Sequence, residues 1–552
     1  MIPRVTTARS HDASGPSGRD VVGPLLIAVV FAGIVASYRD FVPYWDAKGY
    51  FDCVAHAART SFDLLNYHCF GHATIAYLLP LVFTQYLAPW NVSLTYAANA
   101  LLGTASIIAF HALLRLLFPK RSAVEYALVT ALYAFAPLFV VHAIFLNLDY
   151  GMTAFFALFL YFLLARRFRL ASVFAAAMML SKETGAAVYA VTVAAYVIAF
   201  AIRTPLSWTE RLAQLRLQAP LAAAPLAVAS YVVAFRMLHP GPGSWVSSYA
   251  QVGMLGDPLN AFLNMNPADA GIRSFLADIF VLNYQWLYTG VLIAAVCAAV
   301  VRTGDRDQAR SALAGSGLFL SLVLVPLVYV VTRYRDYNNA RYVLVMSPVL
   351  VAAFYHALLS VFANGAVRRL FLVVTVALVF VSNFRTVDVL SKAVFGTFTF
   401  GSHALLDMPS LLGGPRLDST VYNLESLQYS YLLTDMMQDL RPAPRTVLFM
   451  GDTTHNFPPR VDARTYVPTV DPSHALPLAV LAGDGDVQRD TLRTHVAGEG
   501  DRFFYMAFAN ADNHQLRLLL KEYPLVATKR YERNGYTLDL YTFQFTSMGV
   551  KK

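Results

Sequence analysis

The 552-residue sequence contains few charged residues and almost no cysteine. Asp, Glu, Lys and Arg make up 14% of the chain, whereas an ordinary soluble protein carries about 25%. The three cysteines exclude a disulfide-rich scaffold and any four-cysteine zinc or iron–sulfur site. The sequence also lacks a cluster of His and carboxylate residues with the spacing of metal ligands. Neither a metal nor another cofactor is therefore expected.

Hydrophobic residues take the place of the missing charge, since they form 57% of the chain and give it a mean hydropathy of +0.49. Residues 1–400 hold 45 of the 77 charged residues, and residues 401–552 hold the other 32. In the first part the basic residues lie between apolar runs, as in the loops of a membrane protein. They do not gather on a hydrophilic surface, as nucleic-acid binding requires. We therefore predict a polytopic α-helical membrane protein in the lipid bilayer, with a soluble C-terminal domain and no nucleic-acid partner.

The apolar runs define a predicted transmembrane domain over residues 22–395. Residues 1–21 are polar and are expected to form a disordered cytoplasmic N-terminus, because a signal peptide would place its apolar region nearer the start. A hydrocarbon core of ~30 Å requires about 20 helical residues, so about 11 transmembrane helices are predicted. The short run 170–180 is expected to form a bent pair with 185–202 around the sequence SKETG. The runs lie near 22–38, 94–117, 123–145, 150–165, 170–180, 185–202, 219–238, 284–301, 313–332, 342–362 and 369–387.

The basic loops set the predicted orientation. If the ambiguous run 72–88 lies in the membrane interface, every basic cluster falls on one side, which the positive-inside rule makes cytoplasmic. The outer loops are then residues 39–93, 146–149, 239–283 and 332–341. Cys53 and Cys69 share the first of these loops, where an oxidising compartment would permit a disulfide.

Residues 396–552 are expected to form a soluble extracytoplasmic α/β domain. The segments 446–452 and 502–509 have the composition of strands, and 510–524 that of a helix between strands. The segment 528–545 carries Asn-Gly between two alternating runs, which is the strongest short-range signal for a β-hairpin.

Two acidic positions lie at predicted outer helix ends. Asp46 follows the first span beside Trp45, and a carboxylate near aromatic neighbours can act as a general base. The alternative is an interfacial turn in which Asp46 caps a helix. Asn147 and Asp149 fall at the junction of two later spans, where Asp149 either takes part in function or serves only as the N-cap of the next helix.

Basic residues supply the second set of candidates. Lys182 and Glu183 interrupt an apolar stretch, and such intramembrane charges mark a substrate path or form an ion pair with each other. Arg333, Arg335 and Arg341 crowd one short outer loop, where guanidinium groups suit the oxygens of a phosphate. Contact with membrane headgroups is the simpler interpretation of these arginines.

The order of these elements resembles the GT-C superfamily of glycosyltransferases that use polyprenyl-phosphate sugars. An acidic residue after the first span is followed by an interfacial stretch, a basic inner loop, a second acidic junction, a Ser/Thr-Lys-x-x-Gly bend and a late Arg-Tyr-x5-Pro element. The resemblance covers about residues 20–390 and is greatest to the protein O-mannosyltransferase and lipid A aminoarabinose transferase branch. It implies a multi-pass protein of a bacterial inner or cell membrane rather than of the endoplasmic reticulum.

The resemblance implies roles for individual residues. Asp46 matches the catalytic aspartate of the first loop, Asp149 the second acidic motif, Lys182 the lysine of the bend, and Arg341 with Tyr342 the late Arg-Tyr element. The sequence departs from the family pattern in two places. Aminoarabinose transferases carry a His-Lys-Pro-Pro-Leu-like stretch after the first loop, and the only polar side chain available there in this sequence is His72. Protein O-mannosyltransferases carry an Asp-Glu pair in the first loop, and in this sequence Ala47 takes the place of the Glu.

The expected reaction moves a sugar from a polyprenyl-phosphate donor to a hydroxyl of a lipid, glycan or protein acceptor outside the cytoplasm, with inversion. Asp46 would remove the proton of the hydroxyl. Lys182 and the three arginines would hold the developing phosphate dianion. A transporter or flippase of a lipid-linked saccharide is the main alternative, although the two related halves typical of many transporters are not seen. A sensor whose tail binds a small molecule is a third.

Overall fold

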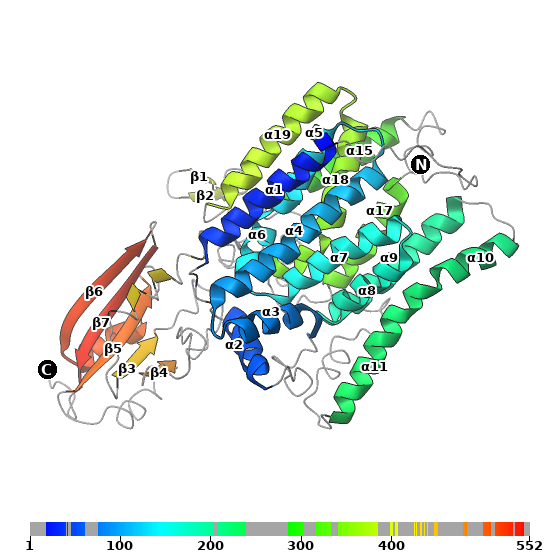
Figure 1. Cartoon of the computed structure of the whole chain (residues 1–552). Coiled ribbons are helices and arrows are strands. Elements are labelled where there is room, and N and C mark those ends of the chain that lie inside the picture. Colours follow the sequence, from blue (N-terminus) through cyan, green and yellow to red (C-terminus); the bar gives the residue numbers. More distant parts are fainter. Residues whose placement is uncertain are drawn as a thin grey trace.

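A computed structural model gives the arrangement of the chain (Figure 1). It describes residues 18–39, 41, 43, 46–60, 75–203, 208–238, 285–302, 316–332, 340–384, 398–400, 403–406, 424, 427, 431–432, 435–436, 439, 446–450, 478–482, 501–508, 514–533 and 536–545.

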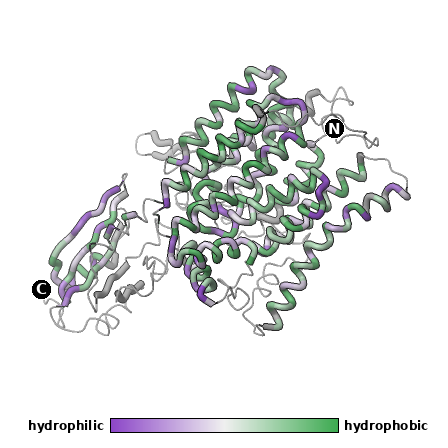
Figure 2. The backbone as a smooth tube through the Cα atoms, viewed as in Figure 1, coloured by the Kyte–Doolittle hydropathy of each residue, from purple (hydrophilic) through white to green (hydrophobic). Residues whose placement is uncertain are grey.

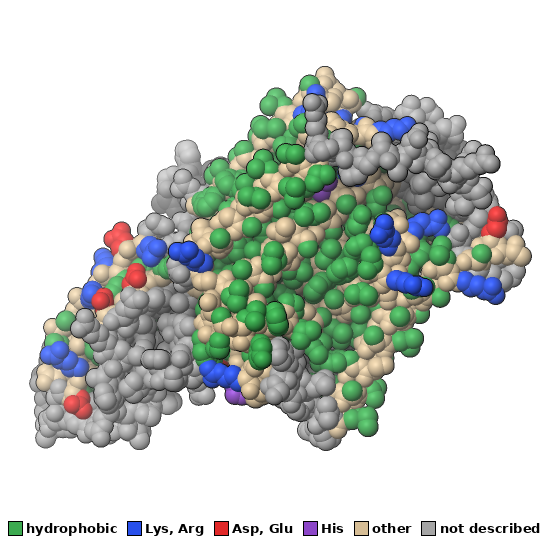
Figure 3. Space-filling view, viewed as in Figure 1, with side chains coloured by type: hydrophobic (Ala, Val, Ile, Leu, Met, Phe, Trp, Pro, Cys, Tyr) green, Lys and Arg blue, Asp and Glu red, His purple; other side chains and the backbone are tan. Residues whose placement is uncertain are grey.

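Most described residues form one helical bundle (Figure 1). Its helices are rich in hydrophobic residues (Figure 2), and hydrophobic side chains cover much of the face seen in Figure 3. Its elements are α1 (Gly18–Ser37), α2 (Asp46–Arg59), α3 (Ile75–Leu87), α4 (Val92–Leu117), α5 (Ala123–Ala134), α6 (Pro137–Ile144), α7 (Leu148–Leu164), α8 (Phe168–Met179), α9 (Thr184–Arg203), α10 (Trp208–Gln218), η1 (Ala219–Ala222), α11 (Ala223–Leu238), α15 (Gln285–Arg302), α17 (Ser316–Thr332), η2 (Ala340–Met346), α18 (Ser347–Val361) and α19 (Gly365–Ser382).

The bundle is a multi-pass membrane protein. Among the described residues, four helices are long and apolar enough to cross a bilayer: Val92–Leu117, Thr184–Ile202, Arg216–Phe235 and Arg341–Val361. Several shorter apolar helices lie beside them, and the number of 11 spans remains a prediction. Helix α3 has 13 residues and is about 20 Å long at ~1.5 Å per residue. Whether the run 72–88 lies in the interface or crosses the membrane stays a prediction.

The segment predicted as one span over 123–145 is broken into α5 and α6. The two helices meet at an angle of 54°, with Pro137 at the first turn of α6. Proline lacks the N–H of a helical hydrogen bond and clashes with the preceding turn. The two helices together remain apolar enough for one span, but the bend between them was not predicted from the sequence.

The SKETG sequence forms a bend between two helices, as predicted. Phe168 at the start of α8 contacts Tyr196 in the second half of α9, with ring centroids 6.1 Å apart, so the two helices run antiparallel. A Cβ on Gly185 would lie 2.5 Å from the carbonyl oxygen of Met178. Only glycine permits this close approach of α9 to the end of α8.

Helix α7 lies at the centre of the bundle. It packs against α4, α8 and η2, and every residue from Leu148 to Leu160 is buried. Gly151 allows Tyr77 of α3 to lie against the helix, since a Cβ there would be 2.3 Å from the Tyr77 ring. The start of α7, with Asp149, is therefore enclosed by neighbouring elements.

The C-terminal part contains a mixed sheet with strand order β4-β3-β5-β7-β6. The predicted strands, helix and hairpin are all present, with α26 packing on the sheet through Leu516 and Leu519. Strands β1, β2 and β4 were not predicted from the sequence. The elements are β1 (Phe398–Phe400), β2 (His403–Leu406), β3 (Thr446–Met450), β4 (Leu478–Ala482), β5 (Arg502–Phe508), α26 (His514–Glu522), β6 (Leu525–Arg533) and β7 (Tyr536–Gln544).

The sheet lies beside the end of the bundle that carries α2 and α3 (Figure 1). Tyr431 joins the two parts, because its ring contacts the buried Phe41 at 6.1 Å and receives the Arg533 guanidinium of β6 at 4.3 Å. On the same strand, β6, the pKa of the Tyr531 hydroxyl is raised, first by burial and then by the nearby carboxylates of Asp439 and Asp435.

Candidate active site

The first element of the site is the start of α7. Asn147 is its N-cap, and the Asn147 side-chain oxygen accepts a hydrogen bond from the Asp149 N–H at 2.9 Å. An asparagine cap satisfies an amide that would otherwise lack a partner at the helix start. Asp149 is therefore a residue of the first turn and not the cap, so its carboxylate is available for other contacts. That carboxylate is 2% exposed.

The bend between α8 and α9 brings Lys182 to this carboxylate. The Nζ of Lys182 lies 2.6 Å from Oδ1 of Asp149. The Ala76 N–H of α3 donates to the carbonyl of Leu180 and so ties the bend to the interfacial helix. The partner of the Lys182 ammonium in this structure is thus Asp149, which is distant in the sequence.

Helix η2 brings a second cation. The Nε of Arg341 lies 3.7 Å from Oδ2 of Asp149, and the Arg341 side chain is 14% exposed. The ring of Tyr342 lies under both cations, with the Lys182 Nζ 4.2 Å and the Arg341 Cζ 5.3 Å from its centroid. The negative face of an aromatic ring attracts a cation in this geometry.

Among the described side chains, Lys182 and Arg341 both approach the one carboxylate of Asp149. Removing charges from water costs several kcal/mol per ion, so buried cations are stabilised by anions close to them. A phosphate group would bring further negative charge and accept hydrogen bonds from both an ammonium and a guanidinium. The arrangement is suited to holding an anion, and the Asp149 carboxylate is occupied by the two cations.

His142 of α6 also belongs to this site and was missed as a candidate in the sequence. It interacts electrostatically with Arg341, Asp149 and Lys182, and its Nδ1 lies 2.7 Å from the carbonyl oxygen of Leu138. Because a carbonyl oxygen only accepts, Nδ1 carries the proton and Nε2 faces away from that bond. The available signal was a histidine within an apolar helix, seven positions before Asp149.

Five of the predicted site residues therefore meet: Asn147, Asp149, Lys182, Arg341 and Tyr342. Glu183 follows Lys182 in the bend and is half-buried. Asp46 is the first residue of α2, and its side chain lies outside the described part of the structure. His72, Arg333 and Arg335 also lie outside the described residues. Cys53 is disulfide-bonded. Cys69, the other cysteine of the predicted first outer loop, falls within the same undescribed stretch as His72.

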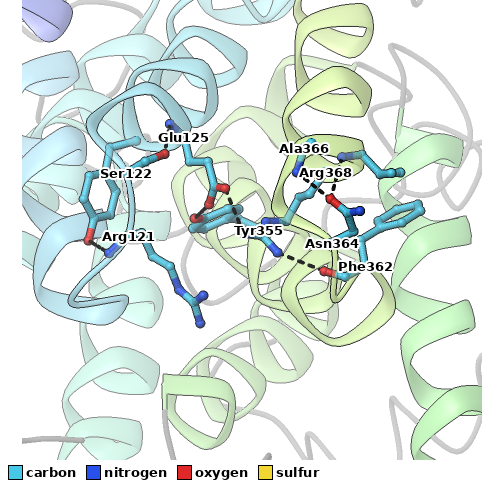
Figure 4. Close-up of polar contacts among 10 residues, drawn as sticks. Arg121, Ser122, Glu125, Tyr355, Phe362, Asn364, Ala366 and Arg368 are labelled. Carbon is cyan, nitrogen blue, oxygen red and sulfur yellow. Dashed lines mark hydrogen bonds and ion pairs between the residues drawn. The ribbon is translucent and has the colours of Figure 1, made fainter.

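A second buried ionic cluster joins α5, α18 and α19 (Figure 4). Glu125 receives hydrogen bonds from Arg368 at 2.8 Å and from the Tyr355 hydroxyl at 2.6 Å. Arg368 also donates to the carbonyl of Phe362. Glu125 and Arg368 thus form a buried ion pair, as expected of residues that join helices. In the described residues no group of three metal-ligating side chains occurs.

Comparison with known proteins identifies the architecture. No protein-family model and no curated protein matches the sequence. The structure of ArnT from Cupriavidus metallidurans bound to undecaprenyl phosphate matches with a TM-score of 0.51 and 14% identity, covering 97% of this chain and 100% of that one. The fold is that of ArnT. The apo structure of the same ArnT matches with a TM-score of 0.48 and 14% identity, over 94% of this chain and 97% of that one.

The ArnT-like fold agrees with the GT-C resemblance drawn from the order of the motifs. ArnT is a lipid A aminoarabinose transferase of the GT-C type, the branch named from the sequence. At 14% identity the likeness is one of fold, so the chemistry of this chain has to be argued from its own residues.

Proposed function

We propose that this protein is a membrane glycosyltransferase that moves a sugar from a polyprenyl-phosphate donor to a hydroxyl acceptor. The observation that carries the proposal is the pair of cations, Lys182 and Arg341, on the single buried carboxylate of Asp149. The solved ArnT structure was bound to undecaprenyl phosphate, which is a ligand of the same chemical class. Its fold likeness adds support from outside the chain.

In this proposal the two cations bind the phosphate that links the sugar to the lipid. The bond from the anomeric carbon to the phosphate oxygen breaks, and the phosphate changes from a singly charged diester to a monoester that approaches a dianion. Lys182 and Arg341 stabilise that added charge, which is how fixed positive groups accelerate group transfer. Asp149 and the Tyr342 ring hold both cations in place before the donor arrives.

The acceptor hydroxyl needs a base, and we assign that role to Asp46. The hydroxyl oxygen attacks the anomeric carbon as its proton passes to the Asp46 carboxylate, a step worth roughly a hundredfold or more in rate. Direct displacement inverts the anomeric centre. We place the reaction on the extracytoplasmic face. The basic loops are predicted at the opposite end of the bundle, and the positive-inside rule makes that end cytoplasmic. The acceptor is a lipid, a glycan or a protein.

The test supplies membranes that contain the full chain with a panel of radiolabelled polyprenyl-phosphate sugars. We expect the label of one donor to leave the lipid fraction, and we expect Lys182→Met to abolish that loss. Membranes without the protein provide the background. The proposal fails if no donor is consumed above that background and if the purified chain also does not bind undecaprenyl phosphate.

A further inference from the structure

A cavity of about 440 Å³ lies at the end of the bundle away from the candidate active site. Asp149 begins α7 and Arg166 follows its last turn, so the 17 residues of the helix separate the two sites by about 25 Å. Of the eight described residues that line the cavity, four are arginines, and none of these eight is acidic. They are Arg166, Arg167, Phe168, Arg169, Leu170, Arg216, Leu217 and Pro220.

The arginines come from two separate parts of the chain. Arg166 and Arg167 belong to the turn between α7 and α8 and Arg169 to the first turn of α8, whereas Arg216 lies in the last turn of α10. Figure 3 shows Lys and Arg side chains gathered on the side of the molecule where these helices meet. Three of the four arginines are exposed, so a ligand at the protein surface can reach their charges. They are Arg167, Arg169 and Arg216.

The backbone of the turn gives a second observation. Arg166 has φ of 59°, and the N–H groups of Arg166 and Arg167 donate to the carbonyls of Leu163 and Phe162. This pattern closes a helix in the way that usually requires glycine, because glycine takes a positive φ without strain. The backbone conformation of position 166 would thus favour glycine, and the presence of an arginine there needs a reason in its side chain. Its side chain hydrogen-bonds Tyr196 of α9 and is held at the cavity.

Apolar surface continues from the cavity along the bundle. Leu170 and Val173 of α8 are 40% and 60% exposed, and Leu226 of α11 is 66% exposed. The arginines thus stand at the end of an apolar surface that faces hydrocarbon chains in a membrane. A free anion would need only the charges, whereas a phospholipid would use both the charges and this apolar surface.

We propose that the cavity binds the phosphate headgroup of an anionic phospholipid, with its acyl chains along α8 and α11. Guanidinium groups form paired hydrogen bonds with phosphate oxygens, and a cavity of this volume is within the range of ~300–1,000 Å³ for small-molecule sites. This site is distinct from the one proposed for the sugar donor and does not depend on glycosyl transfer.

The test uses the full chain, purified in neutral detergent and freed of lipid. Binding of phosphatidylglycerol and of phosphatidylcholine with matched acyl chains is measured by native mass spectrometry, with inorganic phosphate as competitor. The double variant Arg167→Gln/Arg216→Gln removes two exposed charges from the cavity. The matched control Lys120→Gln/Arg369→Gln removes two exposed charges from the same end of the bundle but outside the cavity.

We expect the unmodified chain to prefer phosphatidylglycerol, and we expect the cavity variant to lose at least tenfold in affinity while the control stays within twofold. Equal losses in the two double variants would overturn the proposal, because binding would then follow total charge. Equal binding of the two lipids would also overturn it. Displacement of the lipid by an equal concentration of inorganic phosphate would instead assign the cavity to a free anion.

Discussion

The ammonium of Lys182 and the carboxylate of Asp149 meet at 2.6 Å although 33 positions separate them in the chain. Both side chains are less than 10% exposed, and Arg341 approaches the other carboxylate oxygen. This arrangement makes Asp149 the anchor of two cations.

Asp149→Asn keeps the shape of the side chain and removes its charge. Lys182 and Arg341 would then lose the carboxylate that both of them approach, and breaking a buried ion pair in this way costs about 3–5 kcal/mol. We expect a lower unfolding temperature in thermal scans and reduced but measurable sugar transfer. Unchanged stability would contradict the role of Asp149 as the anchor of the two cations.

Arg341→Ala removes one phosphate ligand and is expected to lower transfer strongly. Arg341→Lys restores the charge without the two-pronged guanidinium geometry, so only part of the activity should return. Initial rates at several donor concentrations measure both effects. Full recovery by lysine would mean that charge alone matters at this position.

Asp46→Asn removes the proposed base at the first residue of α2. Turnover should fall at least a hundredfold, while binding of undecaprenyl phosphate stays close to that of the unmodified protein. Turnover like that of the parent would return Asp46 to the role of a helix cap.

The orientation of the chain is tested with single cysteines introduced at positions 120, 167 and 334. An impermeant thiol reagent added outside should label position 334 and leave 120 and 167 unlabelled. External labelling at 120 would mean that the run 72–88 crosses the membrane, and the outer loops would have to be reassigned.

The sequence predicts much of the secondary structure because hydropathy and turn residues act locally. The Asn-Gly signal predicts the hairpin of β6 and β7, and Gly185 marks the bend at Lys182. The break at Pro137 was missed because the apolar run continues through it. Contacts such as Lys182 with Asp149, or Arg368 with Glu125, depend on how distant helices pack. The predicted topology placed Asp149 and Arg341 on one face of the membrane, and the resemblance to a known family added Lys182 to the same site.

The central claim is that Lys182 and its partners hold the phosphate of the donor. The most direct measurement compares the affinity for undecaprenyl phosphate of Lys182→Met and of Glu183→Gln, which changes the adjacent charge in the same bend. We expect Lys182→Met to lose at least tenfold in affinity while remaining folded, and Glu183→Gln to bind like the parent. Equal affinities in both variants, or equal losses that follow a shared loss of fold, would contradict a phosphate site at Lys182.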